Sequence, residues 1–223
     1  MPKLKIQRIL TNGLDEFKKE IKNFAFNTES LLFFFAKIAE NRAGISKDHA
    51  DNVFQRSILI ANELKLSDKE REILKKGAFL RDIGMLGVPE SVLKKKGEYS
   101  DKERVLIQSH TVIGFEMCKS FSSVEDALPI IRHHHERWDG RGYPDGLSKE
   151  NIPLLARIIA VVDSFYSLLT SKPYRDALYK REALAVLVGG AGAFWDPTIV
   201  RIFFDTLKER DKDIFHTPSV NFF

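Results

Sequence analysis

The stretch RHHHERWDGRGYP, at residues 132–144, carries more information about the fold and chemistry of this chain than any other segment. Its three consecutive histidines are half of the six in the whole sequence, and a loop rich in glycine, aromatic residues and proline follows them. Neutral imidazole is the commonest metal ligand in proteins. Adjacent histidines that end a helix and meet such a loop therefore predict a metal site at the mouth of the loop.

The composition is that of an ordinary globular protein. The chain has 223 residues, of which 43% are hydrophobic and 30% charged, and this length fits one large domain. Its formal net charge of +4 is too small to indicate nucleic-acid binding, so we expect no DNA partner. The single cysteine, Cys118, excludes an intramolecular disulfide and favours a reducing, cytoplasmic compartment.

No segment predicts export or a membrane span. Residues 1–10 contain lysines but lack the long apolar core of a secretory signal. The apolar run LLFFFA at residues 31–36 is much shorter than the roughly 20 residues that cross a bilayer. We interpret this run as a buried helix face or as the contact of a homodimer.

Nearly every segment carries apolar residues at helical spacing, and none shows the alternation of a strand. Capping boxes at Ser67–Glu70 and Ser100–Glu103 predict two helix starts, the second helix reaching Met117. Asp196 followed by Pro197 predicts another start. The expected fold is all-α, with at least seven helices around one core. We expect a lead-in at residues 1–26, a domain at 27–209 and a tail at 210–223.

Polar residues that interrupt apolar helix faces are the candidate metal ligands. In chain order they are His49, Asp82, His110, His134, His135 and Asp163. A buried carboxylate without a partner is costly, so it usually forms an ion pair or binds a metal. Each residue alone also fits a simpler interpretation, as a hydrogen-bonded core histidine or an ion-paired aspartate. Six of them in this order favour a metal centre.

The order and context of these residues resemble the HD superfamily, and the loop narrows the resemblance to the HD-GYP family of bacterial phosphodiesterases that act on cyclic di-GMP. The resemblance extends from about residue 41 to 204 and includes HERWDG at 135–140, GYP at 142–144 and PYR at 173–175. It implies a single HD-type helical bundle. It also implies two or three clustered metal ions, often iron or manganese, and hydrolysis of cyclic di-GMP to pGpG or GMP.

The resemblance also assigns roles outside the ligand set. Lys172 and Arg175 occupy the positions of the family's phosphate-contacting basic residues, although both also fit ordinary solvated charges. Trp138, Tyr143 and Pro144 would form an exposed aromatic surface for a partner such as a diguanylate cyclase domain, since Trp and Tyr are favoured anchors. The alternative is that this loop packs on its own domain.

The chain departs from the family at the His-Asp pair, which is Arg81-Asp82 here. Arginine has no lone pair to donate to a metal and stays protonated. The ion that would use His49 and Asp163 with that missing histidine is therefore expected to bind weakly, if at all. The other site is complete, with Asp82, His110, His134 and His135. We expect one divalent ion there, and its ligands suit iron, manganese, zinc or nickel.

Two further positions differ from the family. Met85 replaces a lysine that is expected to steady the reacting groups, and Ile45 replaces a glutamate that members with three metals carry. In one interpretation Arg81 contacts a phosphate oxygen and, with Asp82, retains slow hydrolysis. In the other, the domain binds cyclic di-GMP or a related nucleotide without cleaving it, or serves as a protein-interaction scaffold. We expect weak or absent turnover, and a different phosphoester as substrate stays open.

Overall fold

The computed structural model describes residues 28–171 and 176–210, and its regular elements there are all helical. The α-helices are α2 (Thr28–Arg42), α3 (His49–Glu63), α4 (Asp68–Leu80), α5 (Glu90–Leu93), α6 (Asp101–Gln108), α7 (His110–Cys118), α8 (Leu128–His133), α9 (Leu154–Leu168), α10 (Lys180–Gly190) and α11 (Pro197–Arg210). Short 3-10 helices are η1 (Ile83–Gly87), η2 (Ser122–Ala127) and η3 (Lys149–Asn151). Eight of the described α-helices have seven residues or more, so the all-α prediction is confirmed.

Three parts of the chain lie outside the described residues. They are residues 1–27, 172–175 and 211–223, which include the expected lead-in and nearly all of the expected tail. The proposed domain boundaries therefore stay predictions. Among the described residues, none of the helices combines the length and the apolar character that a membrane span requires.

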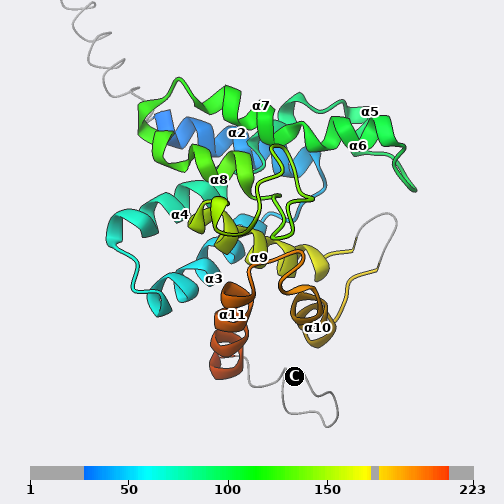
Figure 1. Cartoon of the computed structure of the whole chain (residues 1–223). Coiled ribbons are helices and arrows are strands. Elements are labelled where there is room, and N and C mark those ends of the chain that lie inside the picture. The colour runs from blue at the N-terminus through cyan, green and yellow to red at the C-terminus, as the bar shows by residue number, and fades with distance from the viewer. Residues whose placement is uncertain (1–27, 172–175, 211–223) are drawn as a thin grey trace, which may run out of the picture.

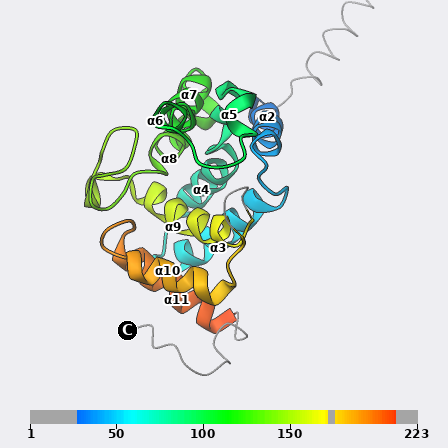
Figure 2. The ribbon, with the colours of Figure 1, turned by 90° about the vertical axis from the view of Figure 1, so that its right-hand side faces the viewer.

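Helix α9 lies at the centre of the molecule in both ribbon views (Figures 1 and 2). It is apolar on most of its circumference, as expected of a helix that is covered on several sides. Its buried residues include Ile158, Ile159, Val162 and Phe165. It contacts α3, α4, α8, α10 and α11. The residues on α9 are therefore held by neighbours from both halves of the chain.

A second group of helices covers one end of this core. Helices α2 and α7 pack on η1, and in Figure 1 they lie above α9 while α10 and α11 lie below it. Within the run at 31–36, Leu32 and Ala36 are buried, whereas Phe34 is 60% and Phe35 38% exposed. The run therefore contributes to the core with one face only. A homodimer contact through the exposed phenylalanines stays a prediction.

The predicted helix starts have a clear physical basis in the structure. Both capping boxes are formed, and the Asp196 carboxylate accepts a hydrogen bond from the Thr198 amide at 2.8 Å. The helix that was expected to run on to Met117 instead breaks at Ser109. The side chains of Ser109, His110 and Thr111 donate to the carbonyls three residues earlier, so they compete with the amides that would continue α6.

Gly84 allows η1 to approach α7 closely. A Cβ atom at this position would lie 1.9 Å from the His110 carbonyl oxygen and 2.5 Å from the Gly114 amide nitrogen, and both are backbone atoms. No side chain can therefore be accommodated here unless η1 and α7 separate. This contact brings Asp82, just before η1, next to His110 at the start of α7.

We expect Gly84→Ala to destabilise the protein by about 1–3 kcal/mol or more, as in an overpacked core. Urea unfolding followed by circular dichroism would measure the change. Gly189→Ala is the matched control, because nothing lies within 4 Å of a Cβ at this helical position and alanine favours a helix. Equal stability of the two variants would contradict the close packing of η1 on α7.

Candidate metal centre

Four of the predicted ligands come together from three parts of the chain. Asp82 lies between α4 and η1, His110 begins α7, and His134 and His135 follow α8. One ligand atom from each of the four residues lies within 4.8 Å of the others. The Asp82 Oδ1 atom is 3.4 Å from His110 Nε2 and 3.9 Å from His134 Nε2. The local folding at η1 and the end of α8 thus forms a compact set of nitrogen and oxygen donors.

The hydrogen bonds of His110 and His134 fix which ring nitrogens face the cluster. His110 Nδ1 donates to the Ile107 carbonyl at 2.6 Å, and His134 Nδ1 donates to the Ile131 carbonyl at 3.0 Å. In a neutral imidazole the Nε2 atom then carries a lone pair. The two Nε2 atoms lie 3.4 Å apart, so two lone pairs and a carboxylate converge. A cation satisfies such a set, and carbonyl contacts on the far nitrogen are usual for metal-binding histidines.

The protonation states favour metal binding. Burial lowers the pKa of His135 well below its ordinary value, and the neighbouring imidazoles lower it further. Burial also lowers the pKa of His110. Burial raises the pKa of Asp82, but the Arg81 cation and the contacts with His134 and His110 outweigh this and hold it low. At neutral pH these shifts favour neutral imidazoles at His110 and His135 and an ionised carboxylate at Asp82, the forms that bind metals.

Arg81 lies on the other side of Asp82, and its side chain is 0% exposed. Its Nε donates to Asp163 Oδ1 at 2.7 Å, and its Nη1 donates to the Ala78 carbonyl. Its Nη2 is 3.1 Å from Asp82 Oδ2 and 3.3 Å from Glu40 Oε1. The guanidinium group thus lies among three carboxylates. Burial lowers the pKa of Arg81, but these carboxylates raise it above its ordinary value, so the group stays charged.

The position of Arg81 bears on two predictions: that it weakens a second metal site, and that it contacts a phosphate. His49 Nε2 donates to the same Asp163 Oδ1 atom at 2.9 Å, so this oxygen already accepts two hydrogen bonds. A guanidinium between Asp82 and Asp163 repels any further cation there. Because Arg81 is enclosed and directed at carboxylates, the geometry gives no support to its predicted contact with a phosphate. His49 and Asp163 lie beside the cluster of four, and their part in a second ion site stays a prediction.

Glu40 is a member of this group that the sequence analysis missed. It lies on α2 and is 4% exposed, and burial raises its pKa to about 7 although Arg81 opposes the shift. A signal was present in the sequence. Leu32, Ala36 and Ala39 are buried and share a helical stripe with Glu40, which is a poor place for an unpaired charge.

The loop after α8 packs on its own domain. The Tyr143 ring stacks on His135 with centroids 5.0 Å apart, and the Trp138 amide donates to the Phe194 carbonyl at 3.1 Å. Trp138, Tyr143 and Pro144 are all only partly exposed. Their role as an aromatic surface for a partner stays a prediction, and of the three only the Tyr143 ring contacts the histidines. Burial, followed by the charges of Asp82 and Asp163, raises the pKa of Tyr143.

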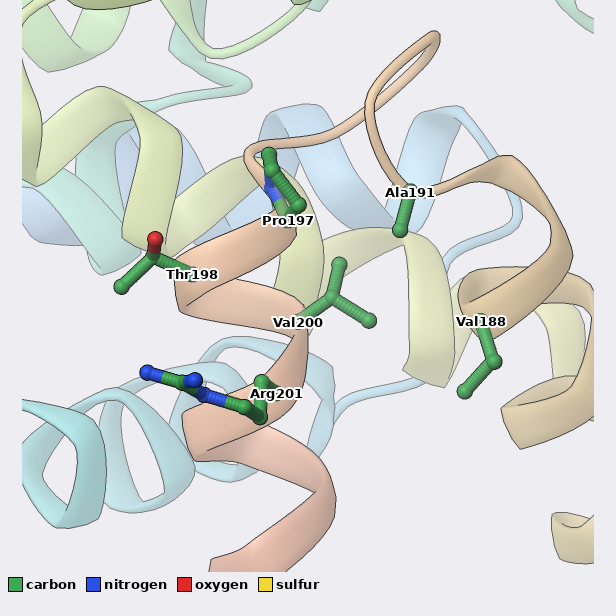
Figure 3. A pocket seen from close by; sticks show the side chains of 6 residues that line it. All are labelled: Val188, Ala191, Pro197, Thr198, Val200 and Arg201. Atoms are coloured by element: carbon green, nitrogen blue, oxygen red, sulfur yellow. The ribbon is translucent and has the colours of Figure 1, made fainter. Parts of the chain in front are cut away.

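Two cavities differ in how they relate to the centre. The larger, of about 660 Å³, is lined by Asn41, Arg42, Ala43, Gly44, Ile45, Met85, Leu93, Lys94, Lys96, Tyr99, Ile107 and Ser171. None of the four clustered residues lines it, and Ile107 accepts the hydrogen bond from His110 Nδ1, the ring nitrogen that faces away from the cluster. A smaller cavity of about 280 Å³ lies between α10 and α11 (Figure 3). Val188, Ala191, Pro197, Thr198, Val200 and Arg201 line it, so its wall is mostly apolar and Arg201 is its one charged residue.

Lys172 and Arg175, the predicted phosphate contacts, lie outside the described residues. Their predicted role therefore stays a prediction. Ser171, the residue before them, lines the larger cavity.

The sequence was compared with protein families and curated proteins. Residues 34–199 match the family model described as HD domain. The response regulator RpfG of Xanthomonas campestris, a cyclic di-GMP phosphodiesterase, is 38% identical over 167 residues, 74% of this chain and 44% of its own length. A cyclic di-GMP phosphodiesterase of Thermotoga maritima is 32% identical over 213 residues, 92% of this chain and 57% of its own length. The chain thus spans about half the length of these relatives.

Solved structures agree at the level of the fold. The protein Bd1817 from Bdellovibrio bacteriovorus, titled a HDG"Y"P protein, has a TM-score of 0.59 and 24% identity, and the match covers 72% of this chain and 51% of that one. The HD domain of the Listeria monocytogenes phosphodiesterase PgpH, solved with cyclic di-AMP, has a TM-score of 0.56 and 17% identity, covering 85% of this chain and 99% of that one. The chain therefore belongs to the HD domain family, and its resemblance to HD-GYP phosphodiesterases is confirmed.

Proposed function

We propose that this domain binds one divalent metal ion through Asp82, His110, His134 and His135 and recognises a cyclic dinucleotide beside it, with weak or absent hydrolysis. The observation that carries this proposal is the enclosed Arg81 guanidinium between Asp82 and Asp163. The substrate class follows from relatives named for cyclic di-GMP and for 3'3'-cGAMP. Three imidazoles and one carboxylate suit zinc, iron, manganese or nickel.

We expect slow hydrolysis because the proposed site lacks a second metal ion and the lysine that the family places where Met85 lies. A divalent ion held here would supply Lewis-acid stabilisation of a phosphoryl oxygen, but paired ions normally stabilise both the attacking and the leaving oxygens. Arg81 brings a positive charge to the place of the second ion but is enclosed and cannot touch a phosphate. Met85 offers only a thioether where the family has a lysine. Loss of one such donor typically lowers the rate by about 10²–10³.

The larger cavity, which Met85 helps to line, is suited to hold a nucleotide. Its volume of about 660 Å³ lies within the usual range for small-molecule sites, roughly 300–1,000 Å³. Tyr99 and Lys96 line it and would supply a ring for a base and an ammonium group for a phosphate, whereas Lys94 forms an ion pair with Glu90. Arg42 already donates to the Leu86 carbonyl at 2.7 Å, so its role is to support this wall.

We expect the purified protein to retain one tightly bound ion at this centre, and His134→Ala to lose it. His49→Ala is the matched control and should keep the ion, because His49 donates to Asp163 instead of facing the cluster. Elemental analysis after dialysis counts the ions. Loss of an ion from His49→Ala would contradict the assignment.

Protons compete with the metal for the imidazoles, and the pKa values of His110 and His135 are lowered. The ion should therefore stay bound as the pH falls through about 6.5, the ordinary pKa of histidine, and should be released only at lower pH.

We expect the manganese- or iron-loaded protein to hydrolyse cyclic di-GMP at or near the background rate. The double change Arg81→His and Met85→Lys should add a second ion and raise the rate by about 10² or more, since it restores a ligand and a donor. Chromatography of the linear product measures both. Arg201→His, on the far side of α11, serves as the control. Rapid metal-dependent turnover by the unaltered protein would contradict the proposal of weak hydrolysis.

Charge reversal in the cavity should weaken nucleotide binding. We expect Lys96→Glu to raise the Kd for cyclic di-GMP about tenfold or more, consistent with roughly 1.5 kcal/mol for a charge-assisted hydrogen bond. Lys208→Glu on α11 makes the same charge change away from the cavity and should leave the Kd unchanged. Calorimetry with both variants makes the comparison. An equal effect from both would assign the loss to net charge and would remove the cavity from the proposal.

A further inference from the structure

A second group of metal-ligating side chains lies where the end of α8 meets the following loop, and the centre described above uses none of them. One ligand atom each from His133, Glu136 and Asp145 lies within 4.8 Å of the others. The three residues are close in sequence, but one lies in a helix and the others lie in the segment that follows it. His133 is the last residue of α8, Glu136 follows it, and Asp145 lies just after Pro144 in the loop.

The separations between these atoms suit a shared ion better than direct contact. His133 Nδ1 is 3.7 Å from Glu136 Oε1 and 3.6 Å from Asp145 Oδ2. Both distances exceed the range of a good hydrogen bond. Two ligands that each lie about 2.1 Å from one ion, at an angle between tetrahedral and trigonal, are about 3.4–3.7 Å apart. The His133 nitrogen is thus placed as one ligand of an ion that two carboxylates also contact.

Two of the polar atoms at this place have no hydrogen-bond partner among the described residues. The Glu136 side chain is 0% exposed, and its Oε1 accepts from the Asp145 amide at 2.8 Å. Its Oε2 has no partner, and neither does His133 Nδ1. Leaving a buried polar group unsatisfied is costly, and for a charged group more so. A cation held between His133 Nδ1 and the Glu136 carboxylate would compensate both side chains.

The net charge around His133, Glu136 and Asp145 is negative, which favours a bound cation. Arg132 binds Asp145 through two hydrogen bonds of 2.7 Å, which fixes the carboxylate in place. With that arginine counted, the formal charges of two carboxylates and one guanidinium sum to −1. Each carboxylate oxygen also keeps a second lone pair. The affinity is therefore expected to be lower than at the centre formed by Asp82 and its three histidines.

We infer that His133, Glu136 and Asp145 form a second divalent-cation site, of the class that takes zinc or manganese. One imidazole, two carboxylates and water are suitable ligands for these ions. Its role would be structural. The ion would join the loop at Asp145 to the end of α8, and so hold the Tyr143 ring on His135. This site is independent of the proposed cyclic dinucleotide activity.

The test is to titrate metal-free protein with zinc and to count the ions bound. We expect two in the unaltered protein, one tight and one weaker, and only the tight one in Glu136→Gln. Glutamine can still accept the Asp145 amide through Oε1, so the loop contact is kept while the charge is removed. Glu150→Gln, an exposed residue, is the matched control and should bind two.

A second measurement does not depend on any variant. Crystals of the unaltered protein grown with zinc should show anomalous scattering among His133 Nδ1, Glu136 and Asp145 when data are collected at the zinc edge. A peak at the Asp82 centre only, together with the same count of ions in Glu136→Gln as in the unaltered protein, would overturn the inference. In that case direct hydrogen bonds hold the loop on α8.

Discussion

The enclosed charge of Arg81 is the constraint on which the rest of this structure depends. It joins Glu40 on α2, Asp82 before η1 and Asp163 on α9, three segments that are far apart in the sequence. Removing one partner from such a buried group typically costs about 3–5 kcal/mol, because the remaining charges are left unpaired. The arginine therefore fixes the relative positions of the helices that surround the metal centre. It also sets the charge that the centre experiences.

Around Arg81, a different kind of contact positions each part of the cluster formed by Asp82 and the three histidines. Gly84 brings η1 against α7, which places His110 next to Asp82. Backbone carbonyls orient the imidazoles of His110 and His134 so that their lone pairs converge. The loop after α8 then covers the histidines with Tyr143. Met85 forms part of the wall of the larger cavity.

The sequence predicted the elements well because their signals are local. Capping boxes and apolar spacing depend on residues three or four apart, and the four clustered residues stood out as polar residues in apolar surroundings. The enclosure of Arg81, the contribution of Glu40 and the burial of Tyr143 could not be read in this way. They depend on contacts between residues 33 to 82 positions apart, which no local pattern records. The break at Ser109 was missed because side chains there compete for backbone carbonyls.

Arg81 differs from a metal ion in one respect that has a cellular consequence. An ion can be removed by a chelator, exchanged for another metal or, if it is iron, oxidised, whereas a guanidinium is covalently attached and keeps its charge throughout. The positive charge that Arg81 contributes to this core is therefore independent of the supply and redox state of metals. The fold should keep the arrangement of α2, α4 and α9 under metal starvation and oxidative stress, conditions that would empty or inactivate a centre built from two ions.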